Sequence, residues 1–242
     1  MENLIYKDLF NKFAVVLGTA HENYTPGKHS PDGLFREPVY SREVVVGIDS
    51  LLKYKGINTF IDYLPLNPLP NWRNKDWRVE QNRELSYRVN FVNNLCKKYG
   101  KANVIYLSVH VDAAGSGGKW MDAGGWSVFT TKGNTPSDKL ATCLYKASTV
   151  YLKDYSIKME EGKKMGKYGK KQKAFRVDYS DGDPDKEANY FVLRNTQCAA
   201  VLTENLFQDN KEDVLYLTSD WGKKAIINLH VEGIINYLKS IA

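Results

Sequence analysis

Two histidines and two glutamates of the sequence lie where short apolar runs end or where a helix is expected to begin. His21 follows the run FAVVLGTA, His110 ends the run NVIYLSVH, and Glu204 follows the run AAVLT. Glu37 precedes an expected helix that has Pro38 near its start. Two neutral imidazoles and one carboxylate can hold Zn²⁺ and leave the fourth tetrahedral position open, as a catalytic zinc site requires. These residues therefore predict a metal site beside a second carboxylate that handles protons.

The other histidines of the sequence are weaker candidates for such a site. A single histidine near a strand end is more often a hydrogen-bonded bystander than a ligand, and this alternative stays open for His21 or His110 taken alone. His29 lies in a loop flanked by Pro and Gly, and we expect it to be exposed to solvent. His230 is four residues from Ile226 and from Ile234, which is the spacing of one helix face, and we expect it on the face of a helix.

Three aspartates have the spacing of the first half of a calcium-binding loop. They are Asp181, Asp183 and Asp185. Such a loop has Gly at its sixth position and Glu at its twelfth, where this sequence has Lys186 and Val192. The sequence therefore favours a solvated acidic turn.

Several common catalytic motifs are missing from the sequence. It has no G-x-x-x-x-G-K-[ST] loop for nucleotide phosphates and no G-x-S-x-G turn for a serine nucleophile, and His21-Glu22 does not continue as H-E-x-x-H. Nucleotide hydrolysis, serine esterase chemistry and the commonest zinc protease motif are thereby excluded.

The pattern of apolar residues predicts the elements that must position the candidate site. Short runs rich in Val, Ile and Leu predict strands buried on both faces, at 13–18, 57–63, 103–111, 126–130 and 199–203. Longer amphipathic stretches predict four helices. The first starts near Pro38, the second ends at Gly100, and the other two cover about 137–154 and 221–241. This alternation predicts an α/β fold, a mostly parallel twisted sheet with helices on both faces, in which ligands bind beyond the carboxyl ends of the strands.

The composition is that of an ordinary globular protein. The chain has 242 residues, of which 43% are hydrophobic and 26% charged, and we expect one domain that spans 1–242. No apolar run is long enough to span a membrane, and the first residues lack the profile of a signal peptide, so the sequence leaves the export route open.

The sequence is basic, and much of the excess charge is local. The net charge of +6 predicts attraction to polyanions or to an anionic cell envelope, with nucleic acid as a weak second alternative because no nucleic-acid-binding motif accompanies it. Seven lysines and three glycines lie at about 157–176. We expect a mobile basic loop there, as a solvated insertion, rather than a packed element.

Five segments of the sequence, in order, resemble the motifs of the zinc-dependent N-acetylmuramoyl-L-alanine amidase family, in the catalytic-domain type shared by bacterial autolysins and phage endolysins. Family members carry a D-P-G-H-G-like turn, a glutamate that opens the first helix, an S-I-H-A-N-like segment, a G-x-S-V-F strand and a late A-V-L-x-E segment. The corresponding segments here are LGTAHEN, REPVYSREVVVGI, SVHVDAAG, GWSVF and AAVLTENLFQDN. Each is weak alone, but five in the same order form a specific signal that covers nearly the whole chain.

The resemblance implies a role for each candidate residue. His21, Glu37 and His110 correspond to the zinc ligands, and Glu204 to the acid/base that takes a proton from the attacking water and delivers it to the departing L-alanine nitrogen. The implied reaction cuts the amide bond between N-acetylmuramic acid and L-alanine in peptidoglycan. A zinc peptidase that cleaves within the stem peptide is the alternative, and a non-catalytic cell-wall-binding module is a third possibility. The implied protein is a monomer that acts on peptidoglycan in the periplasm or cell envelope.

Two features of the resemblance bear on the details of the site. Glu43 competes with Glu37, but counting back one helix length from Gly56 favours Glu37. The first turn departs from the family pattern, because Thr19-Ala20 replaces Pro-Gly and the histidine is followed by an insertion, HENYTPGKHSPDG. The rim of the site is therefore expected to differ from that of other members.

Overall fold

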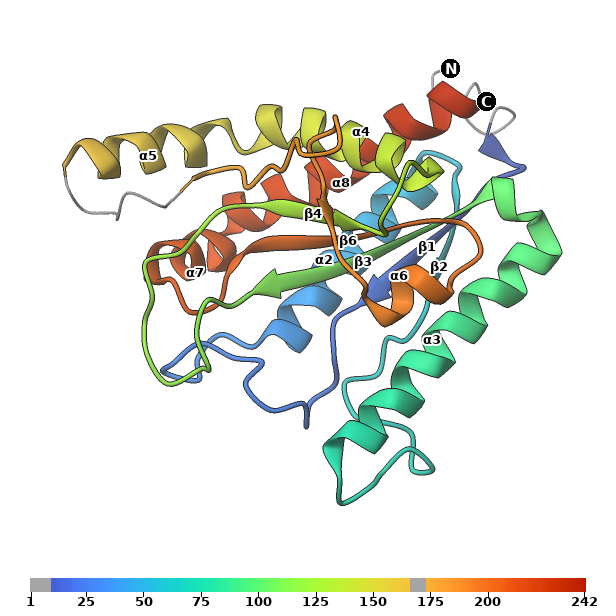
Figure 1. The fold of residues 1–242 in the computed structure, drawn as a ribbon, viewed down its shortest axis with the longest axis horizontal. Helices are drawn as coiled ribbons and strands as arrows, with labels where there is room; N and C mark the ends of the chain where they lie inside the picture. The colour runs from blue at the N-terminus through green and yellow to red at the C-terminus, as the bar shows by residue number, and fades with distance from the viewer. Residues whose placement is uncertain (1–9, 166–172) are drawn as a thin grey trace.

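The computed structural model of the chain describes residues 10–165 and 173–242. Within these ranges six strands form one sheet, in the order β2-β1-β3-β6-β4-β5 (Figure 1). β2, β1, β3 and β6 are parallel, whereas β4 runs antiparallel to β6 and parallel to β5. The predicted α/β fold with a mostly parallel sheet is confirmed. The strands are β1 (Ala14–Thr19), β2 (Asn58–Ile61), β3 (Val104–Asp112), β4 (Ser127–Thr130), β5 (Lys186–Glu187) and β6 (Ala199–Phe207).

Helices cover both faces of the sheet. In Figure 1, α6 lies in front of the sheet and α2 behind it. None of the helices in the described ranges is both long enough and apolar enough to cross a membrane. The helices are α2 (Glu37–Tyr54), α3 (Trp77–Tyr99), the short 3₁₀ helix η1 (Lys101–Asn103), α4 (Pro136–Tyr151), α5 (Lys153–Lys164), α6 (Phe191–Asn195), α7 (Lys211–Thr218) and α8 (Asp220–Ile241).

The alternation of side chains along the strands explains why the sheet is buried on both faces. In β3, Ile105, Leu107 and Val109 belong to the larger core, which α2, α4 and α8 complete. Val104 and Tyr106 point to the opposite face and join the smaller core with α3 and α6. Successive side chains of a strand point to opposite faces, so a strand with apolar residues at nearly every position requires helices on both sides.

Local capping determines where several helices begin and end. Thr135 and Asp138 form a capping box at the start of α4, in which each side chain satisfies a backbone N–H of the other residue or its neighbour. Gly100 ends α3 with a φ of 84°, a conformation that glycine adopts without steric cost. Both helices therefore start or stop close to where the sequence indicated.

The prediction of a loop over about 157–176 is wrong for its first part. Residues up to Lys164 form the helix α5, which extends beyond the edge of the sheet in Figure 1. Tyr155 and Met159 lie one helical turn apart and are both buried, and they anchor this helix although lysines dominate its composition. Three of the predicted loop's lysines lie outside the described residues: Lys167, Lys170 and Lys171.

The expected end of the last strand is also wrong. β6 continues through Phe207 instead of ending at Thr203, so Glu204 lies inside the strand and not after it. The strand extends past Thr203 because it pairs with a strand on each side: Glu204 is in register with His110 of β3 and with Ser127 of β4. Pairing with two neighbouring strands is a tertiary effect that the short apolar run AAVLT did not indicate.

The predicted solvated acidic turn is observed only in part. Asp181 is exposed, but Asp185 is only 2% exposed to solvent. The prediction is wrong for Asp185, because packing against β4 and α4 buries it.

His230 lies on a face of α8, as expected, and is fully buried. Its Nε2 atom is 2.9 Å from Thr203 Oγ1, and its Nδ1 atom is 2.7 Å from the carbonyl oxygen of Ile226. Burial lowers the pKa of His230 to about 4, so the folded protein keeps this imidazole neutral where an unfolded chain would protonate it.

We expect His230 to make the protein less stable in mild acid. Between about pH 6.5 and 4 the unfolded chain binds a proton at His230 that the folded chain does not, so this contribution to stability is complete above about pH 6.5 and is lost as the pH falls. The loss is about 2.5 kcal/mol at about pH 4.5. Urea unfolding over this pH range, with His230→Gln as the comparison, measures it. Equal pH slopes for the parent and the variant would contradict the prediction.

Candidate metal centre and active site

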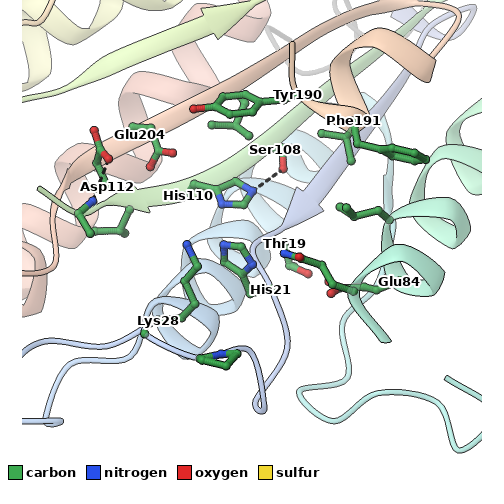
Figure 2. Close-up of a pocket in the computed structure, with 18 of the residues that line it drawn as sticks. Thr19, His21, Lys28, Glu84, Ser108, His110, Asp112, Tyr190, Phe191 and Glu204 are labelled. Atoms are coloured by element: carbon green, nitrogen blue, oxygen red, sulfur yellow. Dashed lines mark hydrogen bonds between the residues drawn. The ribbon is translucent and has the colours of Figure 1, made fainter. Parts of the chain in front are cut away.

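A cavity of about 580 Å³ lies at the carboxyl ends of β1, β3 and β6 (Figure 2). This is the edge of a parallel sheet at which ligands are expected to bind. His21, which follows β1, lines the cavity together with His110 of β3 and Glu204 of β6. Further residues that line it are Lys28, Glu84, Ser108, Asp112, Tyr190 and Phe191.

His21, Glu37 and His110 form a compact cluster. The Oε1 atom of Glu37 lies 3.0 Å from His110 Nδ1 and 3.6 Å from His21 Nε2. The two imidazole rings are 5.0 Å apart, centre to centre, and nearly perpendicular. One candidate ligand atom from each of the three residues lies within 4.8 Å of the others. Residues that are distant in the sequence thus present two nitrogens and one oxygen to the same point.

The pleat of the sheet explains why His110 and Glu204 share a face. His110 is four residues after Tyr106, and Glu204 is two residues after Leu202, so each pair of side chains points to the same side of its strand. Tyr106 and Leu202 both belong to the core under α3 and α6. The register then places His110 directly beside Glu204 on neighbouring strands.

His21 is held in an unusual backbone conformation. Its φ is 42°, in the left-handed region that residues other than glycine rarely adopt. Arg42 supports this turn by donating to the carbonyl oxygens of His21, at 2.9 Å, and Ala20, at 3.0 Å. Ser41 accepts a hydrogen bond from the N–H of Ala20 and donates one to the carbonyl oxygen of Val109, so it ties the end of β1 to β3. Residues of α2 therefore position His21 relative to the strand that carries His110.

Electrostatics keep the cluster in a form that can bind a cation. Burial alone would raise the pKa of Glu37, but His21, a hydrogen bond with His110 and the nearby Lys28 lower it to about 2. Burial lowers the pKa of His21 well below its usual value and favours the neutral imidazole, while attraction to Glu37 acts in the opposite direction. Metal ligands must be deprotonated, and these are the protonation states that a cation requires.

The residues of the cluster fit a zinc ion. Glu37 is 1% exposed, and its Oε2 atom has no hydrogen-bond partner among the described residues, although Lys28 Nζ lies 3.7 Å away. A buried carboxylate oxygen without a hydrogen bond is costly unless a cation or a proton satisfies it. Two histidines and one carboxylate are also the donor set of many catalytic zinc sites. Ser108 Oγ lies 3.1 Å from His110 Nε2 and can orient the ring (Figure 2).

Glu204 faces the same cavity and has a different environment. It is partly buried, and its Oε2 atom has no hydrogen-bond partner in the described part of the chain. Burial, followed by repulsion from the carboxylates of Asp112 and Glu37, raises the pKa of Glu204 well above its usual value, while Lys28 and Lys186 act in the opposite direction. A carboxyl group with a raised pKa next to a cation site is typical of an acid/base group.

A comparison with models of protein families shows to which family the chain belongs. The family model described as N-acetylmuramoyl-L-alanine amidase matches residues 15–236. The chain belongs to this family.

Relatives and solved structures agree with this membership. An endolysin of Bacillus phage SPP1 is 31% identical over 134 residues, which are 55% of this chain and 40% of the endolysin, so the match spans less than half of that relative. The CwlD amidase from Clostridioides difficile, solved in complex with the GerS lipoprotein, has a TM-score of 0.70 at 18% identity and covers 94% of this chain and 99% of its own. The catalytic domain of CwlV, an N-acetylmuramoyl-L-alanine amidase from Bacillus (Paenibacillus) polymyxa var. colistinus, gives 0.65 at 17% identity, with coverages of 94% and 98%. At these identities the structures show a shared fold.

The structure of this amidase family member distinguishes Glu37 from Glu43, the two glutamates that the sequence offered as the third residue of the cluster. Glu37 lies in the cluster, whereas Glu43 is exposed and forms an ion pair with Lys223 of α8 at 2.5 Å. His29 is partly buried rather than exposed, because its Nδ1 atom lies 2.7 Å from the carbonyl oxygen of Ser30.

Sequence reasoning missed three residues of the cavity in this family member. Lys28 belongs to the insertion after His21 and still reaches the buried Glu37. Ser108 could have been found, since it is two residues before His110 and therefore on the same face of the strand. Asp112 is two residues after His110, so the same spacing could have placed it on this face of the strand, but only the pairing of β3 with β6 places it near Glu204.

Proposed function

We propose that the chain is a zinc-dependent N-acetylmuramoyl-L-alanine amidase whose metal ligands are His21, Glu37 and His110. The observation that carries this proposal is the convergence of these three side chains on one point, beside Glu204, at the ligand-binding edge of the sheet. The family membership supports the substrate, which is the amide bond between N-acetylmuramic acid and L-alanine in peptidoglycan.

The mechanism follows from the arrangement of the chain's own residues. Zinc, when bound, supplies a Lewis acid that polarises the scissile carbonyl and makes water a better nucleophile near neutral pH. Glu204 accepts a proton from the attacking water and delivers it to the departing L-alanine nitrogen, so it acts as general base and then as general acid. Its raised pKa favours the second role, and the positive charge of a cation held by the cluster favours the ionised form that the first role requires.

The surroundings of the site fit an extended polar substrate. The cavity combines charged side chains with the aromatic rings of Tyr190 and Phe191 at the start of α6 (Figure 2). A substrate of this kind places the protein's action at the cell wall, outside the cytoplasm. We propose that residues 1–242 act as one catalytic domain and as a monomer, and that the basic segment at about 157–176 increases attraction to anionic cell envelopes.

Analysis of the products tests the proposed reaction. We expect digestion of purified peptidoglycan to release free muramoyl carboxylates and peptides that begin with a free L-alanine amine, and we expect a zinc chelator to stop the release. Mass spectrometry of the soluble fragments measures both. A cut between two amino acids would instead identify a stem-peptide peptidase, and the absence of any soluble fragment would indicate a wall-binding module.

A further inference from the structure

A second group of acidic side chains lies at the edge of the sheet opposite the cavity. Asp138 comes from the first turn of α4, and Asp183 and Asp185 come from the segment just before β5. They meet near Thr130, the last residue of β4. Because β4 runs antiparallel to β6, this end of β4 lies away from the carboxyl end of β6 and from the candidate active site.

The three carboxylates are close enough to share one ion. One candidate ligand atom from each residue lies within 4.8 Å of the other two. Asp183 Oδ1 also accepts a hydrogen bond from the N–H of Asp185 at 3.2 Å, which fixes the turn between them. Asp138 is fixed as well, because its two oxygens accept from the N–H and the hydroxyl of Thr135 at 2.6 and 3.2 Å. Each ligand therefore has a defined position before any ion binds.

Asp185 provides an independent indication of a ligand. The residue is only 2% exposed, and its Oδ2 atom accepts a hydrogen bond from the hydroxyl of Thr130. Its Oδ1 atom is buried and has no hydrogen-bond partner among the described residues. An unsatisfied, buried carboxylate oxygen that belongs to a group of three carboxylates requires a proton or a cation.

No side chain of the described residues supplies the missing positive charge. None of the ion pairs that the structure shows between described residues includes Asp138, Asp183 or Asp185. Two basic residues are adjacent in sequence to these aspartates. Lys186 places its Nζ atom over the ring of Phe129 at 4.7 Å, and Lys139 donates a hydrogen bond from Nζ to the carbonyl oxygen of Ser240 at 2.9 Å.

We propose that Asp138, Asp183 and Asp185 bind a calcium ion. All the available ligands are oxygens, which hard divalent cations prefer, and three carboxylates on two separate segments suit the large and flexible coordination shell of Ca²⁺ better than the strict octahedron of Mg²⁺. Water molecules complete the shell. With only three protein side chains as ligands, the site has the weak affinity of extracellular calcium modules, about 10⁻⁴ to 10⁻³ M.

The bound ion joins two parts of the fold that are distant in the sequence. It ties the segment before β5 to the start of α4, and that segment leads directly to Tyr190 and Phe191 of the catalytic cavity. Calcium therefore stabilises the approach to the active site without taking part in its chemistry.

Thermal unfolding of the full chain, purified without chelator, tests the proposal. We expect about 10 mM CaCl₂ to raise the Tm by about 3 to 10 °C, because a ligand that binds only the folded state stabilises it. NaCl of equal ionic strength and MgCl₂ at the same concentration are the ionic controls, and both should produce much smaller shifts. Equal shifts with Ca²⁺ and Mg²⁺, or no shift with Ca²⁺, would overturn the calcium assignment.

Matched variants separate a specific site from general charge screening. Asp185→Asn and Asp183→Asn should lose most of the calcium-dependent shift, whereas Asp181→Asn, which removes an exposed charge of the same turn, should keep it. Without calcium we expect Asp185→Asn to be at least as stable as the parent, since it removes repulsion between the buried Asp185 carboxylate and its neighbours. A shift of parental size in both Asp183→Asn and Asp185→Asn, or an equal loss in Asp181→Asn, would refute the site.

Discussion

We expect Glu204→Gln to lower kcat on peptidoglycan by roughly 10²- to 10⁴-fold, the usual contribution of a positioned acid/base group. Glutamine keeps the shape of the side chain but cannot accept the proton of the attacking water. The substitution also removes a partly buried carboxylate that is repelled by Asp112 and Glu37, so we expect no loss of folding stability. Turnover of purified peptidoglycan, measured together with zinc content and thermal unfolding, checks all three expectations.

The zinc content of Glu204→Gln distinguishes its proposed role from that of a ligand. We expect about one zinc ion per chain in both the parent and the variant, because Glu204 lies beside the cluster and not in it. Near-normal turnover would show that another group is the base, and Asp112 is the next carboxylate that lines the cavity. Loss of zinc would make Glu204 a ligand.

We expect Glu37→Gln to lose the zinc ion and Glu43→Gln to keep it. The neutral amide is a much weaker zinc ligand than a carboxylate, and the two histidines alone leave the site short of one ligand. We therefore expect the metal content to fall from about one ion per chain to near zero, with activity lost in parallel. Glu43 lies on the same helix and forms an ion pair with Lys223, so it is a matched control for the loss of one negative charge from α2.

Stability measurements keep this comparison interpretable. In Glu37→Gln the amide side chain retains an oxygen that can accept the hydrogen bond that Val111 N–H donates to Glu37 Oε1 at 3.2 Å, so the metal-free variant should still fold. Elemental analysis after gel filtration gives the metal content, and thermal unfolding confirms the folded state. Zinc retained by Glu37→Gln, or lost equally by Glu43→Gln, would overturn the assigned ligand set.

The elements that carry the site were largely predictable, because their signals are local. The apolar run 103–111 predicted β3 within one residue at each end, and Gly100 indicated the end of α3. Elements with weak local signals were missed. β5 has two residues, α6 has five and α7 has eight, and all three depend on packing against longer elements. The segment that forms α5 was predicted as a loop, because its lysines outnumber the apolar residues, such as Tyr155 and Met159, that indicate a buried helix face.

The sequence by itself determined the fold class and the family, because hydrophobic periodicity and short motifs are encoded within a few neighbouring positions. It also predicted four residues for the candidate active site. Only the tertiary structure decided which residues meet. The register between β3 and β6 placed Glu204 beside His110. Glu37, in the first turn of α2, contacts His110, whereas Glu43 of the same helix pairs with Lys223. The aspartates of one turn looked solvated in the sequence, until the fold buried Asp185 and added Asp138 from α4. Contacts between distant segments depend on strand register and helix packing, which no local pattern of residues specifies.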